Sequence, residues 1–242
     1  MINADDYLAL VEDWTDPYEP PVIEIHDDVH VVRDDLLPAG SKIRFIDKLI
    51  RDTECEEWVF GGSNKVGWGP ISLAYVCKKY NKSSTCFWAA RKEPTWHQEK
   101  YLEYGGNIEW VKMGMLNVTL SKAEHYRRES PQTRKTLPLG LEHDWVLGSI
   151  DVIWTVGSSG TLNRGLQLAF PESEVHVIQT GHKLSERQIG RAILHEVPYK
   201  FDKPVKEAEA PPFPSAPEYD AKAWKVIKEN MNKNKTNLFW NV

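Results

Sequence analysis

The sequence predicts an α/β protein in which strands and helices alternate along most of the chain. Between Glu57 and Arg128 these patterns recur about every 25 residues, as in strand–helix–strand units around a parallel sheet. Two of the expected strands run directly into turns rich in glycine and serine, at 61–64 and 157–161. α/β proteins bind ligands where such turns follow the carboxyl ends of strands.

The N-terminal part is expected to hold two short strands and one amphipathic helix. A proline-rich and acidic arm, 13–21, precedes alternating runs at 22–25 and 29–32, which are typical of short edge strands. A turn of small residues at 38–42 then leads into a helix that Ser41 can cap. The apolar residues at helical spacing that predict this helix are Ile43, Phe45, Ile46, Leu49 and Ile50.

The middle of the chain carries the clearest alternation. A polar run at 129–135 interrupts it, and we interpret this run as a crossing between domains. We expect strands at 57–60, 85–89, 107–111, 150–156 and 174–179. We expect helices at 70–80, 95–104, 120–128 and 161–169.

The last third changes in composition. Residues 204–217 are rich in proline, alanine and glutamate, which predicts an extended connection along the surface. A helical pattern resumes at about 220–231. The polar tail ends in Leu238-Phe239-Trp240, and we expect these side chains to dock on the body of the protein or on a second subunit.

Charge and cysteine content exclude several classes of protein. A net charge of −5 and a pI near 5.9 argue against a protein that is basic overall, so free nucleic acid is not the default partner. Cys55, Cys77 and Cys86 are odd in number and lack C-x-x-C spacing, which indicates reduced thiols. The first ten residues resemble no signal peptide, and no apolar run reaches the ~18 residues of a membrane span. We expect a cytoplasmic protein that does not enter membranes.

Histidine and tryptophan are not expected to form a metal or base-stacking site. The eight histidines include no H-E-x-x-H pattern, so no metal centre is predicted. Trp58, Trp88, Trp110 and Trp154 fall within apolar strands and are expected in the core.

The glycine-serine turn over Gly157, Ser158, Ser159, Gly160 and Thr161 is a candidate anion site. Unpaired amides and the helix dipole converge at a turn that opens a helix. The turn lacks both the lysine of a P-loop and a G-x-G-x-x-G pattern. These residues alone leave a phosphate site and an unliganded tight turn as alternatives.

Four motifs in one order supply a more specific interpretation. They are Lys42 after Gly-Ser, Gly61-Gly62-Ser63-Asn64, the 157–161 turn, and the run 217–223 with sequence Pro-Glu-Tyr-Asp-Ala-Lys-Ala. This order resembles the fold-type-II pyridoxal-phosphate enzymes, and among them the aminocyclopropane-carboxylate deaminase and D-cysteine desulfhydrase group. The similarity runs from about Val32 to Trp224, although this chain is shorter than those enzymes.

The resemblance implies an α/β fold of two three-layer αβα parts, similar to the tryptophan synthase β subunit, with the cofactor in the cleft between them. Residues 1–52 and 130–242 would form the larger, cofactor-binding domain, and 53–129 the smaller one. The expected assembly is a homodimer.

The resemblance also assigns roles to cofactor-binding residues. Lys42 would be the Schiff-base lysine, and Asn64 would hydrogen-bond the phenolic oxygen of pyridoxal 5'-phosphate. The 157–161 turn would hold the phosphate. Asp220 would face the pyridine nitrogen, where the deaminase has a glutamate.

Substrate-binding roles follow in the same way. Ser63 would hold the substrate carboxylate, with Asn64 beside it, and Tyr219 would lie beside the substrate. Lys65 departs from the family pattern; it could recognise a second anionic group or compete with Lys42 for the aldehyde. The region 181–217 is shortened, and Tyr199 is the nearest candidate for the family's further pocket tyrosine.

The implied function is an enzyme that forms an aldimine with an amino-acid substrate and breaks a bond at Cα by deamination, elimination or decarboxylation. Compact members resembling this chain occur in tailed phages among genes for thymidine hypermodification. One alternative is therefore a decarboxylase or lyase acting on an amino acid joined to a thymidine base, with DNA as a substrate only. Another is a non-catalytic binding protein of the same fold.

Overall fold

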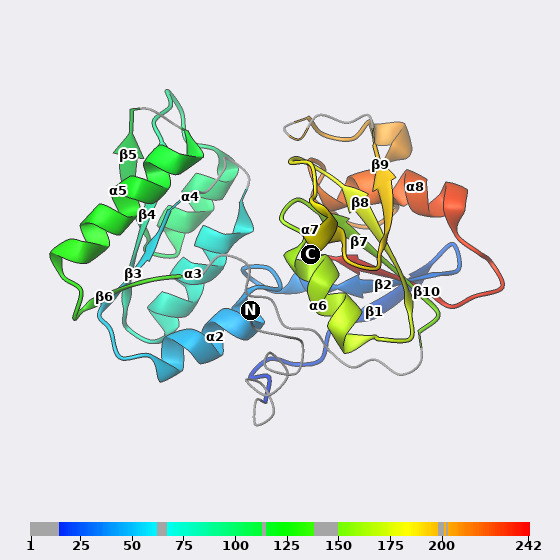
Figure 1. Ribbon diagram of the computed structural model, residues 1–242, viewed down its shortest axis with the longest axis horizontal. Helices are drawn as coiled ribbons and strands as arrows, with labels where there is room; N and C mark the ends of the chain where they lie inside the picture. The colour runs from blue at the N-terminus through cyan, green and yellow to red at the C-terminus, as the bar shows by residue number, and fades with distance from the viewer. Residues whose placement is uncertain (1–14, 62–66, 113–114, 138–149, 198–200, 202) are drawn as a thin grey trace. The chain divides into compact units, whose positions relative to one another are not determined.

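The structure, a computed structural model, describes residues 15–61, 67–112, 115–137, 150–197, 201 and 203–242. The chain divides into two compact units, one made of 1–36 with 142–242 and the other of 37–141 (Figure 1). The sequence-based division placed the smaller domain at 53–129. Which part of the chain acts as a separate domain stays a prediction.

The first unit is built on a six-stranded sheet with the order β1-β2-β10-β7-β8-β9 (Figure 1). Only the β1–β2 pair is antiparallel, and the other neighbours are parallel. The strands are β1 (Ile23–His26), β2 (Val29–Arg33), β7 (Val152–Gly157), β8 (Glu174–Gln179), β9 (Ile193–Glu196) and β10 (Asn237–Asn241). Its helices are η1 (Asp34–Leu36), α6 (Thr161–Ala169), α7 (Glu186–Ile189), η2 (Glu207–Glu209), η3 (Asp220–Lys222) and α8 (Ala223–Asn230).

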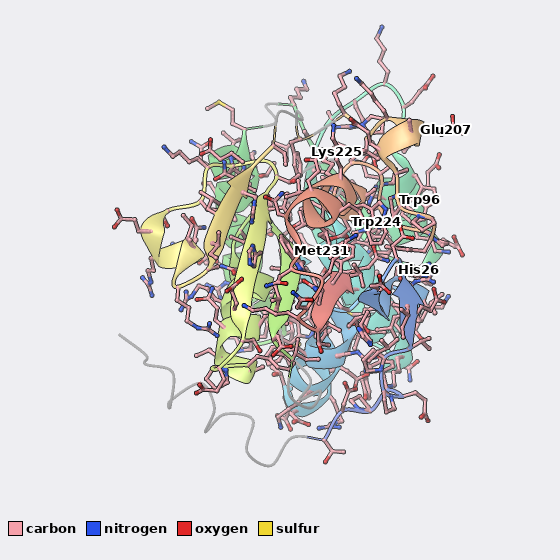
Figure 2. All side chains as sticks on the ribbon, turned by 90° about the vertical axis from the view of Figure 1, so that its right-hand side faces the viewer. His26, Trp96, Glu207, Trp224, Lys225 and Met231 are labelled. Atoms are coloured by element: carbon pink, nitrogen blue, oxygen red, sulfur yellow. The ribbon has the colours of Figure 1, made fainter. Side chains whose placement is uncertain are left out.

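Both faces of this sheet are covered by apolar packing, because alternate residues of each strand point to opposite faces. On one face Trp154 and Val156 of β7 pack with Trp224 and Ile227 of α8. On the other face Ile153 packs with Leu166 and Phe170 from α6 and its end, and with residues of the neighbouring strands: Val175, Leu238 and Trp240. Figure 2 shows Trp224 on α8, where the neighbouring Lys225 pairs with Glu209 at 2.8 Å.

The C-terminal tail forms a central strand of the first unit. β10 lies between β2 and β7 and is parallel to both, and all five of its residues are buried. The prediction that Leu238-Phe239-Trp240 docks on the body is therefore confirmed. The prediction that residues 29–32 form an edge strand is wrong, because β2 lies between β1 and β10 in the sheet. β1 does lie at the edge of the sheet.

The second unit has a four-stranded parallel sheet with the order β5-β4-β3-β6 (Figure 1). Its strands are β3 (Glu57–Phe60), β4 (Ser83–Ala89), β5 (Asn107–Val111) and β6 (Arg134–Thr136). Its helices are α2 (Ile43–Asp52), α3 (Trp68–Lys79), α4 (Trp96–Glu103) and α5 (Leu116–Glu129). The polar run at 129–135 thus enters β6, which pairs with β3, instead of linking two sheets.

The tryptophans of the second unit divide into two groups. Trp58 and Trp88 are almost fully buried, as predicted. Trp110 is 44% exposed, so its assignment to the core is wrong. β5 is an edge strand, and Trp110 and Val111 point to opposite faces of it, so only Val111 reaches the core against α5. In the part of the chain that the structure describes, no helix has both the length and the apolarity to cross a bilayer.

Candidate functional site

The site predicted at 157–161 lies at the carboxyl end of β7, a strand that is buried throughout. α6 begins at Thr161, and Gly160 precedes it with a φ of +74°. Residues other than glycine rarely adopt this left-handed backbone conformation, so the turn into the helix depends on Gly160. The amides of the first turn of α6 and the positive end of its dipole point out of the helix at this turn, which favours an anion.

Three glycines allow the turn to pack closely against its neighbours, because they lack side chains. A Cβ atom on Gly157 would lie 2.7 Å from the Val177 side chain, and one on Gly160 would lie 2.8 Å from the main chain of Gln188. A Cβ on Gly181 would come within 2.9 Å of Ser158 Oγ. The 157–161 turn is therefore packed against residues 177–188, which run from the end of β8 into α7.

The hydroxyl groups of this turn lie together at its surface. Ser159 Oγ and Thr161 Oγ1 are 3.0 Å apart, and the amide of Thr161 lies 3.5 Å from Ser159 Oγ. Ser158 is half-buried and Ser159 is exposed. Hydroxyl and amide donors thus converge around Gly160, as a phosphate group requires.

Tyr219 and Asp220 join the same site from the other end of the chain. The Tyr219 hydroxyl donates a hydrogen bond to the carbonyl oxygen of Val156 at 3.1 Å, one residue before the turn. Burial of this hydroxyl and the charge of Asp220 raise the pKa of Tyr219, while a hydrogen bond from the Ser158 main chain lowers it. The Tyr219 ring is only partly buried, so the enclosed part is its hydroxyl end.

Asp220 starts η3 and is buried, with 1% of its surface exposed. It lies beside Tyr219, whose hydroxyl reaches the end of β7. In the first unit, Tyr219 therefore connects η3, which begins with the buried Asp220, to the end of β7 that precedes the 157–161 turn.

Lys42 belongs to the second unit, where it directly precedes α2 and is half-buried. Lys42 itself is the N-cap residue of α2, with helical backbone angles, and no side chain caps the helix there. The prediction that Ser41 caps the helix is therefore wrong. Ser41 instead offers its carbonyl oxygen to the amide of Arg44 at 3.1 Å.

The turn that carries Lys42 is fastened by side chains of two other helices. Ser72 Oγ donates to the carbonyl oxygen of Ala39 at 2.6 Å, and the Tyr104 hydroxyl donates to that of Pro38 at 2.6 Å. Gly40 has a φ of +76°, and a Cβ there would lie 3.3 Å from the Trp68 ring. The backbone just before Lys42 is therefore held by hydrogen bonds from Ser72 of α3 and from Tyr104 at the end of α4.

Four predicted residues, Ser63, Asn64, Lys65 and Tyr199, lie outside the described residues. β3 leads toward the first three, since it ends at Phe60 and its last residues are buried.

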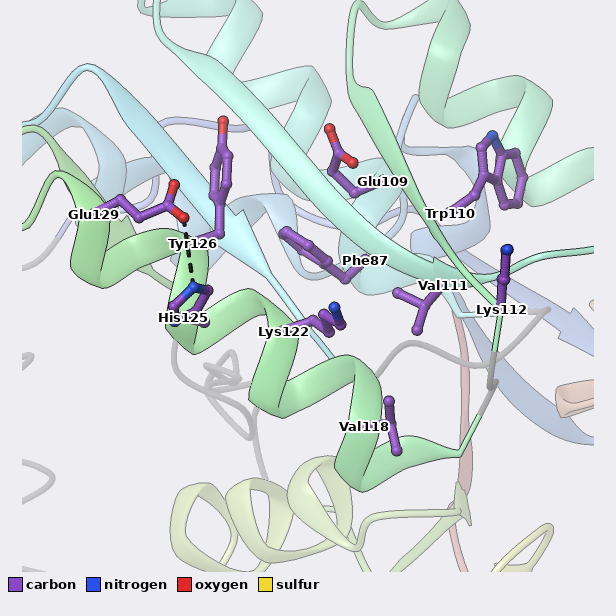
Figure 3. A pocket seen from close by; sticks show the side chains of 10 residues that line it. All are labelled: Phe87, Glu109, Trp110, Val111, Lys112, Val118, Lys122, His125, Tyr126 and Glu129. Carbon is purple, nitrogen blue, oxygen red and sulfur yellow. Dashed lines mark ion pairs between the residues drawn. The ribbon is translucent and has the colours of Figure 1, made fainter.

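A groove with a volume of about 480 Å³ lies elsewhere in the second unit, between α5 and the β4–β5 edge (Figure 3). Its walls include Phe87, Tyr126, Lys122 and His125, and none of the predicted site residues that the structure describes lines it. Within the described ranges, no group of three or more His, Cys, Asp and Glu residues is placed to hold a metal ion.

Sequence reasoning missed Gln188, whose side chain contacts the predicted turn. Its Nε2 donates to the carbonyl oxygen of Ser159 at 2.9 Å. The only local signal is the Ser-x-x-Gln pattern at 185–188, which forms a capping box at the start of α7.

No family model and no curated protein matches the sequence. Solved structures do match the fold. A structure described as an ACC deaminase homologue has a TM-score of 0.70 at 14% identity, covering 97% of this chain and 93% of its own. The fold is that of the fold-type-II pyridoxal-phosphate enzymes.

Two further solved structures match the fold of this chain. Serine racemase from Dictyostelium discoideum has a TM-score of 0.65 at 12% identity, covering 99% of this chain and 95% of its own. Escherichia coli diaminopropionate ammonia lyase has a TM-score of 0.62 at 9% identity, covering 95% and 84%. The α/β fold class predicted from the sequence is confirmed.

Proposed function

We propose that this protein is a pyridoxal-phosphate-dependent enzyme that acts at Cα of an amino-acid substrate. The observation that carries the proposal is the hydrogen bond from Tyr219, the neighbour of buried Asp220, to Val156, which directly precedes the 157–161 turn. The solved structures with this fold include a deaminase homologue, a racemase and an ammonia lyase. Their activities agree with the proposal.

The residues present fit the cofactor's two charged parts. The turn from Gly157 to Thr161 offers amide and hydroxyl donors at a helix N-terminus to a phosphate. Asp220 offers a buried carboxylate to a ring nitrogen. A carboxylate about 4 Å from such a nitrogen favours its protonated form by about 4 kcal/mol at an effective dielectric constant of 20, or about three pKa units.

When bound, the cofactor supplies an aldehyde for the substrate amine and a ring that delocalises negative charge from Cα. Asp220 would hold the ring nitrogen and favour its protonated form, which would strengthen this delocalisation. Lys42 would hold the cofactor by its aldehyde, and its amine would be the group that carries the proton at Cα. Tyr219 contacts the substrate, and its raised pKa keeps its hydroxyl protonated near neutral pH.

The remaining roles concern recognition of the substrate. Ser63 and Asn64 bind its carboxylate and the cofactor's phenolic oxygen. Lys65 binds a second anionic group, and Tyr199 closes the pocket. The protein acts as a homodimer in the cytoplasm, and light scattering of the purified protein tests the assembly.

The decisive experiment identifies the lysine that holds the aldehyde. Borohydride reduction of protein mixed with pyridoxal phosphate fixes a carbonyl compound to the amine it has joined, and peptide mass spectrometry locates the added mass. We expect the mass on Lys42, lost in Lys42→Ala and kept in Lys65→Ala. Labelling of Lys65 alone would reverse the two roles. A protein that binds the cofactor but labels neither lysine would be a non-catalytic binding protein.

The bond broken and the state of the substrate are tested together. D-cysteine, aminocyclopropane carboxylate and DNA carrying an amino acid on thymidine are incubated with the protein, and ammonia, sulfide and carbon dioxide are measured. We expect turnover of a free amino acid. Release of carbon dioxide from the modified DNA alone would instead support the phage hypermodification role.

A further inference from the structure

Gln188 connects the short helix α7 to the 157–161 turn. Its Oε1 accepts hydrogen bonds from the amide and the hydroxyl of Ser185, each at 2.9 Å, which closes the capping box of α7. Its Nε2 donates to the carbonyl oxygen of Ser159 at 2.9 Å. Both ends of the amide group are therefore engaged, and the side chain is fixed in one orientation.

α7 is itself held on α6 by amide side chains. Asn163, which is fully buried, donates from Nδ2 to the carbonyl oxygens of Gln188 at 2.7 Å and Ile189 at 3.0 Å. Gln167 adds a bond from Nε2 to the carbonyl oxygen of Ile189 at 2.9 Å. The position of Gln188 is thus set by the same helix whose N-terminus faces the predicted phosphate.

The contact with Ser159 fixes a peptide plane in the anion-binding turn. In a trans peptide the C=O of one residue and the N–H of the next point in opposite directions. Because Gln188 holds the C=O of Ser159, the N–H of Gly160 points to the other side of the turn, away from α7. The glycine conformation at Gly160 leaves this peptide free to rotate unless something holds it.

We propose that Gln188 is a positioning residue that orients the Gly160 amide toward a bound phosphate. This inference rests on the proposed function only in identifying that phosphate as the cofactor's. Gln188 acts through the peptide between Ser159 and Gly160 and does not contact the ligand. The phosphate-binding strength of the turn then depends on a side chain from a separate helix.

The test measures binding of inorganic phosphate to protein freed of cofactor, for Gln188→Met and Gln188→Glu. Methionine has a similar length and no donor; glutamate keeps the acceptor for Ser185 but cannot donate to Ser159. We expect both variants to bind phosphate about tenfold more weakly, the size of one hydrogen bond's net contribution. The amide resonance of Gly160 should shift on phosphate addition in the unaltered protein and not in the variants.

Matched controls separate this role from loss of a helix cap and from added charge. Gln98 closes an equivalent capping box with Thr95 in the other unit, so Gln98→Met removes a cap without touching the turn. Arg187→Gln lowers the charge of α7 by one, as Gln188→Glu does, at an exposed neighbouring residue. We expect both controls to bind phosphate like the unaltered protein, and melting temperatures confirm that each variant is folded.

Unchanged phosphate affinity in both Gln188 variants would overturn the inference, and so would an equal loss in Gln98→Met or Arg187→Gln. The borohydride experiment reports separately on the proposed function. Labelling of Lys42 together with unchanged phosphate binding in the Gln188 variants would reject only the positioning role. Weakened phosphate binding without any labelled lysine would reject only the cofactor assignment.

Discussion

His97 is a residue whose ionisation is controlled by packing alone. Its ring packs against two tryptophans, with centroids 5.7 Å from Trp68 and 4.9 Å from Trp96. Burial lowers the pKa of His97 from 6.5 to about 4, because the protonated ring would lose its hydration. The neutral imidazole therefore predominates in the folded protein down to a lower pH than in the unfolded chain.

This lowered pKa makes stability depend on pH. Between pH 6.5 and 4 the unfolded chain binds a proton at His97 that the folded protein does not, so the free energy of unfolding falls as the pH falls through this range. We expect His97→Phe to remove about 2 kcal/mol of this acid-induced loss, after allowing for partial exposure of the ring. Urea unfolding at pH 7 and pH 4.5 measures the difference.

The exposed His125 supplies the control, since 81% of its side chain is accessible. His125→Phe, measured in the same way, is the comparison variant. Parallel pH profiles for the unaltered protein and His97→Phe would show that the burial of His97 has no effect on stability.

At the same scale, residue types were enough to propose a candidate site but did not indicate the residues that support it. Lys42, Tyr219 and Asp220 could be proposed because their chemistry and order fit a known pattern. Gln188 could not, because its contact with Ser159 joins residues 29 positions apart and leaves no local trace beyond a helix cap. Trp110 was misassigned because apolar character does not reveal that β5 is an edge strand.

The turn between β7 and α6 can be tested as an element by comparing two glycines with positive φ. Gly160 has a φ of +74° and Gly105 a φ of +86°. A Cβ on Gly105 meets nothing within 4 Å, whereas one on Gly160 lies 2.8 Å from the Gln188 main chain. The two sites share the backbone strain and differ in crowding.

We expect Gly105→Ala to reduce the free energy of unfolding by about 1 kcal/mol, the cost of a left-handed residue. Gly160→Ala should cost about 3 kcal/mol, because displacement of the Gln188 main chain adds to the same strain. Denaturant unfolding of both variants gives the two values. Equal losses would mean that α7 moves aside freely and does not hold the turn.

Helices and strands were predicted well where their periodicity was local. The strand at 57–60 and the strand at 107–111 agree with β3 and β5 in both bounds. The neighbours of a strand in the sheet were not predictable, because parallel pairing joins distant segments. β2 was taken for an edge strand for this reason, since its partner β10 is separated from it by some two hundred residues.

For the molecule as a whole, the two units differ in how the chain builds them. The second unit uses one continuous stretch, 37–141, while the first combines residues from both ends of the chain. The sheet of the first unit is completed only when β10 inserts between β2 and β7. Its stability therefore depends on the last residues of the sequence.

Phe239 is the residue of β10 on which this dependence can be measured. It is fully buried and packs with Val31, Trp154 and Trp224 on the α8 face of the sheet. We expect Phe239→Ala to reduce the free energy of unfolding by about 4 kcal/mol, since it removes a ring and leaves a cavity between the sheet and α8. Trp110→Ala on the exposed edge of the other sheet should cost less than about 1 kcal/mol. Denaturant unfolding compares the two, and a small loss for Phe239→Ala would contradict a central role for β10 in the sheet.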